Sequence, residues 1–333
     1  MPAWRARAEN FEAEIAKAVV GQARVIRLLT IALFARGHVL LEGDVGVGKT
    51  TLLRAAARAV GGAYERIEGT IDLMPGDLIY HTYLAEDGRP RVDEGPVLRA
   101  GEDLAIFFFN EINRARPQVH SLLLRLMAER SVSAFNREFH FPHLVVFADR
   151  NRVEREETFE LPAAARDRFL MEIAISTPTD EATRRALAFD TRFHDGDRLI
   201  GSLEQGILSY NELNAVARAI QSEIKASEAL ERYVLNLWQA IRTPGDAGIQ
   251  IPGVDTTRLV AAGASPRGLS YLVRAARVAA WLDGRTMAVP EDVRAVFYET
   301  MAHRIFFEPV YEMRRETIAR ELIDALFETV PVP

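Results

Sequence analysis

The feature that most constrains this chain is a glycine-rich loop, residues 43–50 (Gly-Asp-Val-Gly-Val-Gly-Lys-Thr). The spacing G-x-x-x-x-G-K-[ST] is met in full by Gly43, Gly48, Lys49 and Thr50. Glycines let backbone N–H groups curl around phosphate oxygens, and the N-terminus of a following helix adds favourable partial charge. In such a loop the lysine reaches the β- and γ-phosphates and the threonine hydroxyl binds Mg²⁺. The motif therefore predicts a P-loop, with ATP and Mg²⁺ as the expected cofactors.

The segments on either side of the loop fit this interpretation. Residues 38–42 form a short apolar run typical of a strand, and residues 50–60 have a helical pattern stopped by Gly61 and Gly62. Strand, glycine loop and helix is the order that a phosphate cradle requires. The predicted nucleotide-binding residues are Gly43, Asp44, Val45, Gly46, Val47, Gly48, Lys49, Thr50 and Thr51.

Short apolar runs alternate with helical patterns in the first half of the chain, which predicts an α/β fold with a mainly parallel, five-stranded sheet. Turn residues between short alternating runs predict two inserted β-hairpins, at 77–98 and 131–142. The expected sheet strands are 38–42, 64–68, 105–109, 144–148 and 171–175, and a helix is expected at 117–129.

After residue 179 the pattern becomes helical throughout. We therefore predict an α/β core at 1–179, a connector at 180–206 and a smaller all-α domain at 207–333, with no strand after 175. The expected helices are 181–189, 210–226, 228–242, 269–281, 290–304 and 314–328.

The apolar run 105–109 ends in Asn110 and Glu111. In a phosphate-cleaving P-loop protein the strand end carries an acidic pair, one member in the magnesium shell and the other polarising the attacking water. Glu111 fits the general base, whereas Asn110 stands where an aspartate is expected. The predicted metal-binding residues are Thr50 and Asn110, with weaker Mg²⁺ retention or slower hydrolysis, and Asn110→Asp should raise turnover. The alternative is that the pair only caps a helix.

Composition narrows the choice of function. The 333 residues carry a formal net charge of −6, which argues weakly against nucleic acid as the partner. The chain has no cysteine, so disulfides and thiolate chemistry are excluded. The N-terminal residues lack an apolar signal segment, and no apolar run is long enough to span a bilayer, so a cytoplasmic location is expected.

Six segments in order resemble the MoxR family of AAA+ ATPases, over about residues 18–305. The resemblance implies the AAA+ core with a helical lid. The segments are GHVLLEG (37–43), DLMPGDLIY (72–80), GPVLRA (95–100), EINRA (111–115), LPAAARDRFL (161–170) and GASPRG (263–268).

The resemblance also implies roles for single residues. Asn151 matches the sensor-1 asparagine that orients water, although its loop, ADRNR (148–152), lacks the Thr, Gln and Pro of the family pattern. Arg168 matches an arginine finger that reaches a neighbouring subunit's nucleotide, and Arg166 could share that task. Arg267 matches sensor 2 on the lid. The expected catalytic set is Glu111, Asn151, Arg168 and Arg267, while Arg114 either acts across the interface or packs. The alternatives are a turn residue at Asn151, a surface ion pair at Arg168 and a structural role for Arg267.

A trans-acting arginine implies a ring, and the family resemblance implies a homo-hexamer that remodels client proteins. In the family this work is chaperone-like maturation of metalloenzymes such as a dehydrogenase, by metal or cofactor insertion, alongside partners with a von Willebrand factor A (VWA) domain. The two hairpins are the expected client-coupling parts. A nucleotide-dependent scaffold or switch with slow hydrolysis is the alternative, and nucleic-acid remodelling is disfavoured by the acidic balance.

Overall fold

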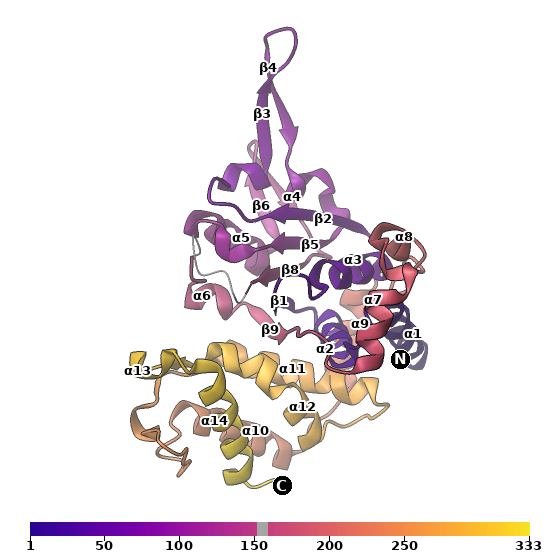
Figure 1. Cartoon of the computed structure of the whole chain (residues 1–333). Helices are drawn as coiled ribbons and strands as arrows, with labels where there is room; N and C mark the ends of the chain where they lie inside the picture. The colour runs from indigo at the N-terminus through magenta and orange to yellow at the C-terminus, as the bar shows by residue number, and fades with distance from the viewer. Residues whose placement is uncertain (152–158) are drawn as a thin grey trace. The chain divides into compact units, whose positions relative to one another are not determined.

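The computed structural model describes residues 1–151 and 159–333, which form two compact units. One holds Pro2–Arg168 and Ile173–Val216, and the other holds Met1, Phe169–Glu172 and Ala217–Pro333 (Figure 1). The first unit is the α/β unit and the second is the helical unit. The α/β fold with a five-stranded sheet is confirmed, while the boundaries at 179 and 206 stay a prediction. None of the described helices is long and apolar enough to cross a membrane.

The central sheet has the strand order β2-β5-β8-β1-β9. The neighbouring pairs β2/β5, β5/β8 and β8/β1 are parallel, so their carboxyl ends meet at one edge. The strands are β1 (His38–Glu42), β2 (Ala63–Glu68), β5 (Leu104–Asn110), β8 (Val145–Arg150) and β9 (Phe169–Ala174).

Strand β5 anchors this sheet because every one of its residues is buried. It lies between β2 and β8 and carries three consecutive phenylalanines, Phe107, Phe108 and Phe109, none of which is exposed. Burying such side chains stabilises the fold by about 1.5–3 kcal/mol each. The strand end at Asn110 is therefore fixed by the core.

The first two helices of the α/β unit are separated at Gly21, whose φ of 74° suits glycine. Helix α2 packs against β1, and α3 packs against β5. Short helix α8, in the predicted connector, was not expected from the sequence. The helices are α1 (Pro2–Ala18), α2 (Ala23–Phe34), α3 (Lys49–Val60), α4 (Pro96–Arg99), α5 (Pro117–Glu129), α6 (Ala163–Arg166), α7 (Glu181–Phe189) and α8 (Gly196–Gly201).

Both predicted hairpins are present. Strands β3 (Tyr80–Leu84) and β4 (Pro90–Glu94) pair antiparallel, and their hairpin projects away from the sheet (Figure 1). Strands β6 (Ser131–Ala134) and β7 (Arg137–His140) form the second hairpin. It turns at Phe135 and Asn136, which both have positive φ, as a two-residue hairpin turn requires.

The second unit is largely helical, but one expectation was wrong. Two short strands, β10 (Val260–Ala262) and β11 (Phe306–Phe307), pair antiparallel after the residue where strands were expected to end. Runs of two and three residues carry no readable alternation, and pairing over 40 residues of sequence is decided by tertiary structure. The helices in this part of the chain are α9 (Leu213–Glu223), α10 (Glu228–Arg242), α11 (Pro266–Leu282), α12 (Pro290–Met301), α13 (Pro309–Glu312) and α14 (Arg315–Thr329).

Candidate functional site

The glycine loop lies between β1 and α3, as predicted. Gly46 and Gly48 have φ of 82° and 92°, which favours glycine. A Cβ added to either would meet no atom within 4 Å, so the loop borders open space. A Cβ at Gly43 would lie 2.5 Å from the carbonyl oxygen of Ile175, so this glycine is required by close packing. The loop has the backbone shape and the room that phosphate groups need.

Lys49 begins helix α3 and is buried, with 7% of its surface exposed. Its Nζ donates to the carbonyl oxygens of Gly43 at 2.7 Å and Asp44 at 3.0 Å. It also donates to Asn151 Oδ1 at 2.7 Å. The ammonium group is thus held at the loop, and phosphate oxygens can replace the two carbonyl contacts.

Glu111 follows β5 in a left-handed conformation, with φ of 53°. Its carboxylate accepts a hydrogen bond from Asn151 Nδ2 at 3.0 Å and pairs with Arg114 Nη1 at 3.0 Å. Gly69, at the end of β2, allows this turn, since a Cβ there would lie 2.2 Å from the carbonyl oxygen of Glu111. The structure therefore places Glu111 beside Asn151, and it shows Arg114 contacting Glu111 within the same chain.

Asp149 is a site residue that was missed in the sequence. It lies on β8, is only 1% exposed and accepts a hydrogen bond from the backbone N–H of Glu111 at 2.5 Å. Its Oδ2 is 3.8 Å from Lys49 Nζ. Burial raises the pKa of Asp149 to about 6, although the Glu111 N–H and the Lys49 charge act in the opposite direction. We call Lys49, Glu111, Asp149 and Asn151 the strand-end cluster.

Asn110 adjoins this cluster and is also buried. The amide orientation that suits its neighbours has the nitrogen donating to Asp149 Oδ1 at 3.3 Å and the oxygen accepting from Arg66 Nη2 at 3.2 Å. Glu111 directly precedes a short 3-10 helix, Ile112–Arg114, but its side chain makes no capping hydrogen bond there. Helix α5 begins only at Pro117. The amide group faces a carboxylate on the next strand, a contact that the sequence alone did not indicate.

Comparison with known proteins agrees with this geometry. The model of the ATPase family associated with various cellular activities (AAA) matches residues 38–171, and an AAA lid domain model matches 255–324. Protein MoxR of Methylorubrum extorquens is 70% identical over 99% of this chain and 96% of its own length. This chain belongs to the MoxR family of AAA+ ATPases.

Two further relatives agree with this membership. Chaperone MoxR1 of Mycobacterium tuberculosis is 34% identical, over 96% of this chain and 81% of its own length. The crystal structure of a candidate ATPase from Cytophaga hutchinsonii superposes with a TM-score of 0.84 at 29% identity, covering 99% of this chain and 96% of that one. As a MoxR-family AAA+ protein, the chain is an ATPase.

Three further arginines, Arg166, Arg168 and Arg267, are expected to complete a MoxR-type site. Arg168, after α6, donates to the carbonyl oxygen of Ala164 at 2.7 Å, and Arg166 ends the same short helix. Arg267 is exposed in the first turn of α11, in the helical unit. Their roles stay predictions. The sensor-1 loop is described up to Asn151, and Arg152 lies outside the described residues.

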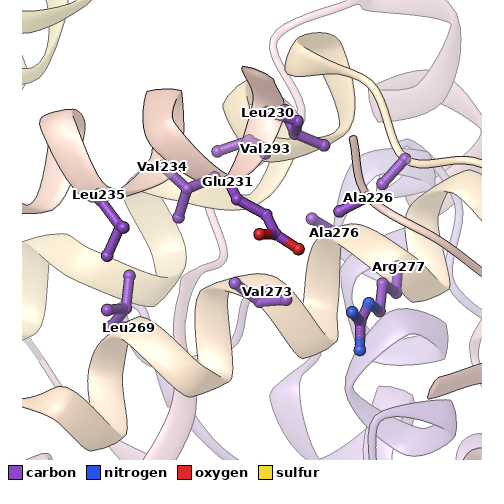
Figure 2. Close-up of a pocket in the computed structure, with 11 residues that line it drawn as sticks. Ala226, Leu230, Glu231, Val234, Leu235, Leu269, Val273, Ala276, Arg277 and Val293 are labelled. Atoms are coloured by element: carbon purple, nitrogen blue, oxygen red, sulfur yellow. The ribbon is translucent and has the colours of Figure 1, made fainter. Parts of the chain in front are cut away.

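The helical unit has a concavity of its own, between α10 and α11 (Figure 2). It has a volume of about 250 Å³ and is lined mainly by aliphatic side chains, including Val234, Leu235 and Val273. Glu231 points into it and Arg277 lies at one end (Figure 2). With this apolar lining and a carboxylate inside, it does not suit phosphate groups. The phosphate chemistry therefore belongs to the P-loop.

Proposed function

We propose that this MoxR-family ATPase works as a hexameric ring that hydrolyses ATP to remodel client proteins. One observation carries the ATP-cleaving part of the proposal. Asn151 joins the phosphate-binding lysine to the general base, because its Oδ1 is 2.7 Å from Lys49 Nζ and its Nδ2 is 3.0 Å from Glu111 Oε1. A phosphate on Lys49 and a water on Glu111 would thus be held by one connected network.

Each member of the network has a distinct task. ATP bound with Mg²⁺ supplies the scissile phosphoanhydride bond and the charge that polarises it. Glu111 accepts the proton of the attacking water, since each carboxylate oxygen has a lone pair beyond its present contact. Asn151 orients that water, and Lys49 stabilises negative charge on the phosphates. Thr50, the second residue of α3, provides the hydroxyl for the metal.

In the proposed ring, the arginines around one nucleotide come from two neighbouring subunits. Arg168, alone or with Arg166, reaches the nucleotide of the neighbouring subunit, and Arg267 contacts the γ-phosphate from the lid. A guanidinium placed across an interface stabilises charge on the transferred phosphoryl group. Hydrolysis then depends on assembly, so nucleotide state and ring geometry are coupled.

Two observations support a chaperone role. The M. tuberculosis relative is named a chaperone. The hairpins expose apolar side chains, among them Tyr80, Tyr83 and Leu84 on β3, and Phe135 at the β6–β7 turn. Exposed apolar groups of this kind mark surfaces that contact other proteins. The proposed clients are metalloenzymes such as a dehydrogenase, which receive a metal or cofactor, with a VWA-domain protein as partner and the cytoplasm as the location.

A mixing experiment tests the ring. Glu111→Gln removes the base, and Arg168→Ala removes the finger, so each variant alone should lose hydrolysis. A 1:1 mixture should recover part of the activity, because an Arg168→Ala site then borrows Arg168 from its Glu111→Gln neighbour. Light scattering with a non-hydrolysable ATP analogue measures ring size. A mixture of Glu111→Gln with Lys49→Ala is the control, because every nucleotide site in it lacks either the base or the lysine and no activity should return. No recovery in assembled mixed rings would rule out action in trans.

A slow switch is the second candidate, favoured by Asn110, which puts no charge at the end of β5. In that case ATP binding alone sets assembly, and hydrolysis only resets it. Multiple-turnover hydrolysis by the assembled ring, compared with the rate of client release, separates the two. Release that is complete before the first turnover favours the switch, and release that tracks turnover favours the remodelling ATPase.

A further inference from the structure

We propose that Asp149 supplies the carboxylate that the magnesium site lacks at Asn110, so that this acidic position lies at the end of β8 instead of β5. The inference rests on the proposed function, because it assigns a residue within the same nucleotide site. It replaces the expectation that the asparagine weakens Mg²⁺ retention.

The strand register places the two positions side by side. On β5 and β8, Phe109 is the partner of Ala148, and Asn110 and Asp149 are the next residues on their strands. Side chains at paired positions of parallel strands point to the same face of a sheet. Consistent with this, the Asn110 amide nitrogen lies 3.3 Å from Asp149 Oδ1. A carboxylate at either position therefore serves nearly the same region of the site.

The burial of Asp149 needs an explanation beyond local hydrogen bonds. A carboxylate that is 1% exposed is costly unless positive charge compensates it. The Lys49 ammonium pairs with Asp149 at 3.8 Å, beyond hydrogen-bond distance, and donates hydrogen bonds to two loop carbonyls and to Asn151. The charge of Arg66 also acts on Asp149. A divalent cation beside Thr50 would add further positive charge. Mg²⁺ is commonly held by one or two carboxylates, with waters and phosphates completing its shell.

The oxygen ligands at this site suit a Mg²⁺ ion that binds together with nucleotide phosphates. Among residues 1–151 and 159–333, no three His, Cys, Asp or Glu side chains converge as a metal site. The Thr50 hydroxyl and one or two carboxylates suit an ion that arrives with nucleotide phosphates. Asp149 can then serve the metal while Glu111 serves the attacking water, because Glu111 is turned toward Asn151 and Arg114.

A positioning role is the competing explanation, since Asp149 accepts the Glu111 N–H. Asp149→Asn separates the two roles. The amide oxygen of asparagine can still accept that N–H, so the Glu111 turn is kept while the charge is lost. Asp87→Asn, at the exposed tip of the β3–β4 hairpin, removes the same charge far from the site and is the matched control.

The test measures Mn²⁺ bound to the full chain with a non-hydrolysable ATP analogue, by electron paramagnetic resonance. For Asp149→Asn we expect Mn²⁺ affinity to fall about 10- to 100-fold, the range for groups that support a metal's ligands. Nucleotide affinity in EDTA should stay unchanged, as should the circular dichroism spectrum. Asp87→Asn should match the parent chain.

The reciprocal exchange, Asn110→Asp with Asp149→Asn, returns the carboxylate to the end of β5 and should restore most of the Mn²⁺ affinity. Asn110→Asp alone is less informative, because it places two like charges where the amide and carboxylate are now 3.3 Å apart. Parent-like Mn²⁺ affinity in Asp149→Asn would overturn the inference and leave the proposed function intact. A parent chain that binds no nucleotide would overturn the proposed function itself.

Discussion

The strand-end cluster and the two hairpins belong to one unit but use their side chains in opposite ways. In the cluster, charged groups such as Lys49 and Asp149 are buried, and each has several polar partners. In the hairpins, apolar groups face solvent, and Leu84 is 74% exposed. Tyr80 and Phe135 bring the two hairpins together, with ring centroids 5.4 Å apart. The difference separates residues that perform chemistry from residues that are free to contact another molecule.

The strand-end cluster and the hairpins also differ in how much a substitution should cost. A buried charged group cannot be removed without leaving its partners unsatisfied, so changes there should affect the chemistry strongly. An exposed apolar side chain makes few contacts in the folded protein. Its substitution should therefore leave the free energy of unfolding and the rate of hydrolysis nearly unchanged. Substitutions in the strand-end cluster should therefore have larger effects on hydrolysis than substitutions in the hairpins.

Lys49→Ala should cause the largest loss. Hydrolysis should fall by more than about 1,000-fold in kcat/KM, because one preorganised charged group is worth about 10²–10³ in kcat and binding weakens as well. Steady-state hydrolysis and the affinity for a fluorescent ATP analogue measure the two effects. Arg54→Ala, which removes a half-buried cation on the same helix, is the control. Full nucleotide affinity in Lys49→Ala would contradict the assigned role.

Glu111→Gln should separate binding from cleavage. We expect kcat to fall by about 100-fold or more, within the range for loss of a general base. Nucleotide affinity should stay within about twofold, because a glutamine oxygen can still accept from Asn151 and no phosphate contact is lost. Single-turnover hydrolysis and equilibrium binding give both numbers. A kcat close to that of the parent would mean that another group activates the water.

The hairpins should show the reverse pattern. Replacing Tyr80, Tyr83 and Leu84 together by serine should keep hydrolysis within about twofold and change the free energy of unfolding by less than about 0.5 kcal/mol per exposed site, apart from the Tyr80–Phe135 contact. Client remodelling should be lost. Thermal unfolding, hydrolysis and a client-activation assay are the measurements. The variant carrying only Tyr83→Ser and Leu84→Ser keeps the ring contact and controls for its loss.

The smallest effect concerns pH. His120 lies on α5, is 1% exposed, and its Nε2 is 2.8 Å from the carbonyl oxygen of Ile112, next to Glu111. Burial lowers the pKa of His120, and the Ile112 hydrogen bond opposes this only in part. The folded chain therefore disfavours the charged ring, so its stabilising contribution is present above pH 6.5, the ordinary value, and is lost as the pH falls below it.

His120→Gln should reduce the loss of stability between pH 7 and 5, by up to about 2 kcal/mol at pH 5, given 1.36 kcal/mol per pH unit. Urea unfolding at several pH values measures it. His140→Gln, at an exposed position of β7, makes the same exchange at the surface and is the matched control. An unchanged profile for His120→Gln would show that other groups set the acid response.

Much of the fold could be predicted because local patterns were strong. The helices Pro117–Glu129 and Glu228–Arg242 have the predicted bounds, since proline at one start and an amphipathic face in both are local signals. The β6–β7 hairpin was predicted from turn residues between two short alternating runs. Strands β10 and β11 were not, because their pairing depends on residues more than 40 positions apart.

The site residues also separate into those that local sequence predicts and those that depend on tertiary contacts. The P-loop could be predicted because all its groups lie in eight consecutive residues. Asp149 and Gly69 could not, because their importance lies in what neighbouring strands bring next to them. In the sequence, Asp149 looked only like a departure from the expected sensor-1 loop. The structure shows that Asp149 lies beside Asn110, and this contact is what indicates a role for Asp149 in the site.

The register between β5 and β8 also bears on how such a site can change over generations. If an acid can serve from either strand, two separate substitutions are needed to move it. An ancestor would have passed through a form with two neighbouring acids or a form with none. Only the form with two acids keeps a metal-binding carboxylate at every step. The substitution that added the acid on β8 should therefore have preceded the one that removed the acid on β5. A search that requires an acid at one fixed alignment column would overlook chains that have completed the exchange.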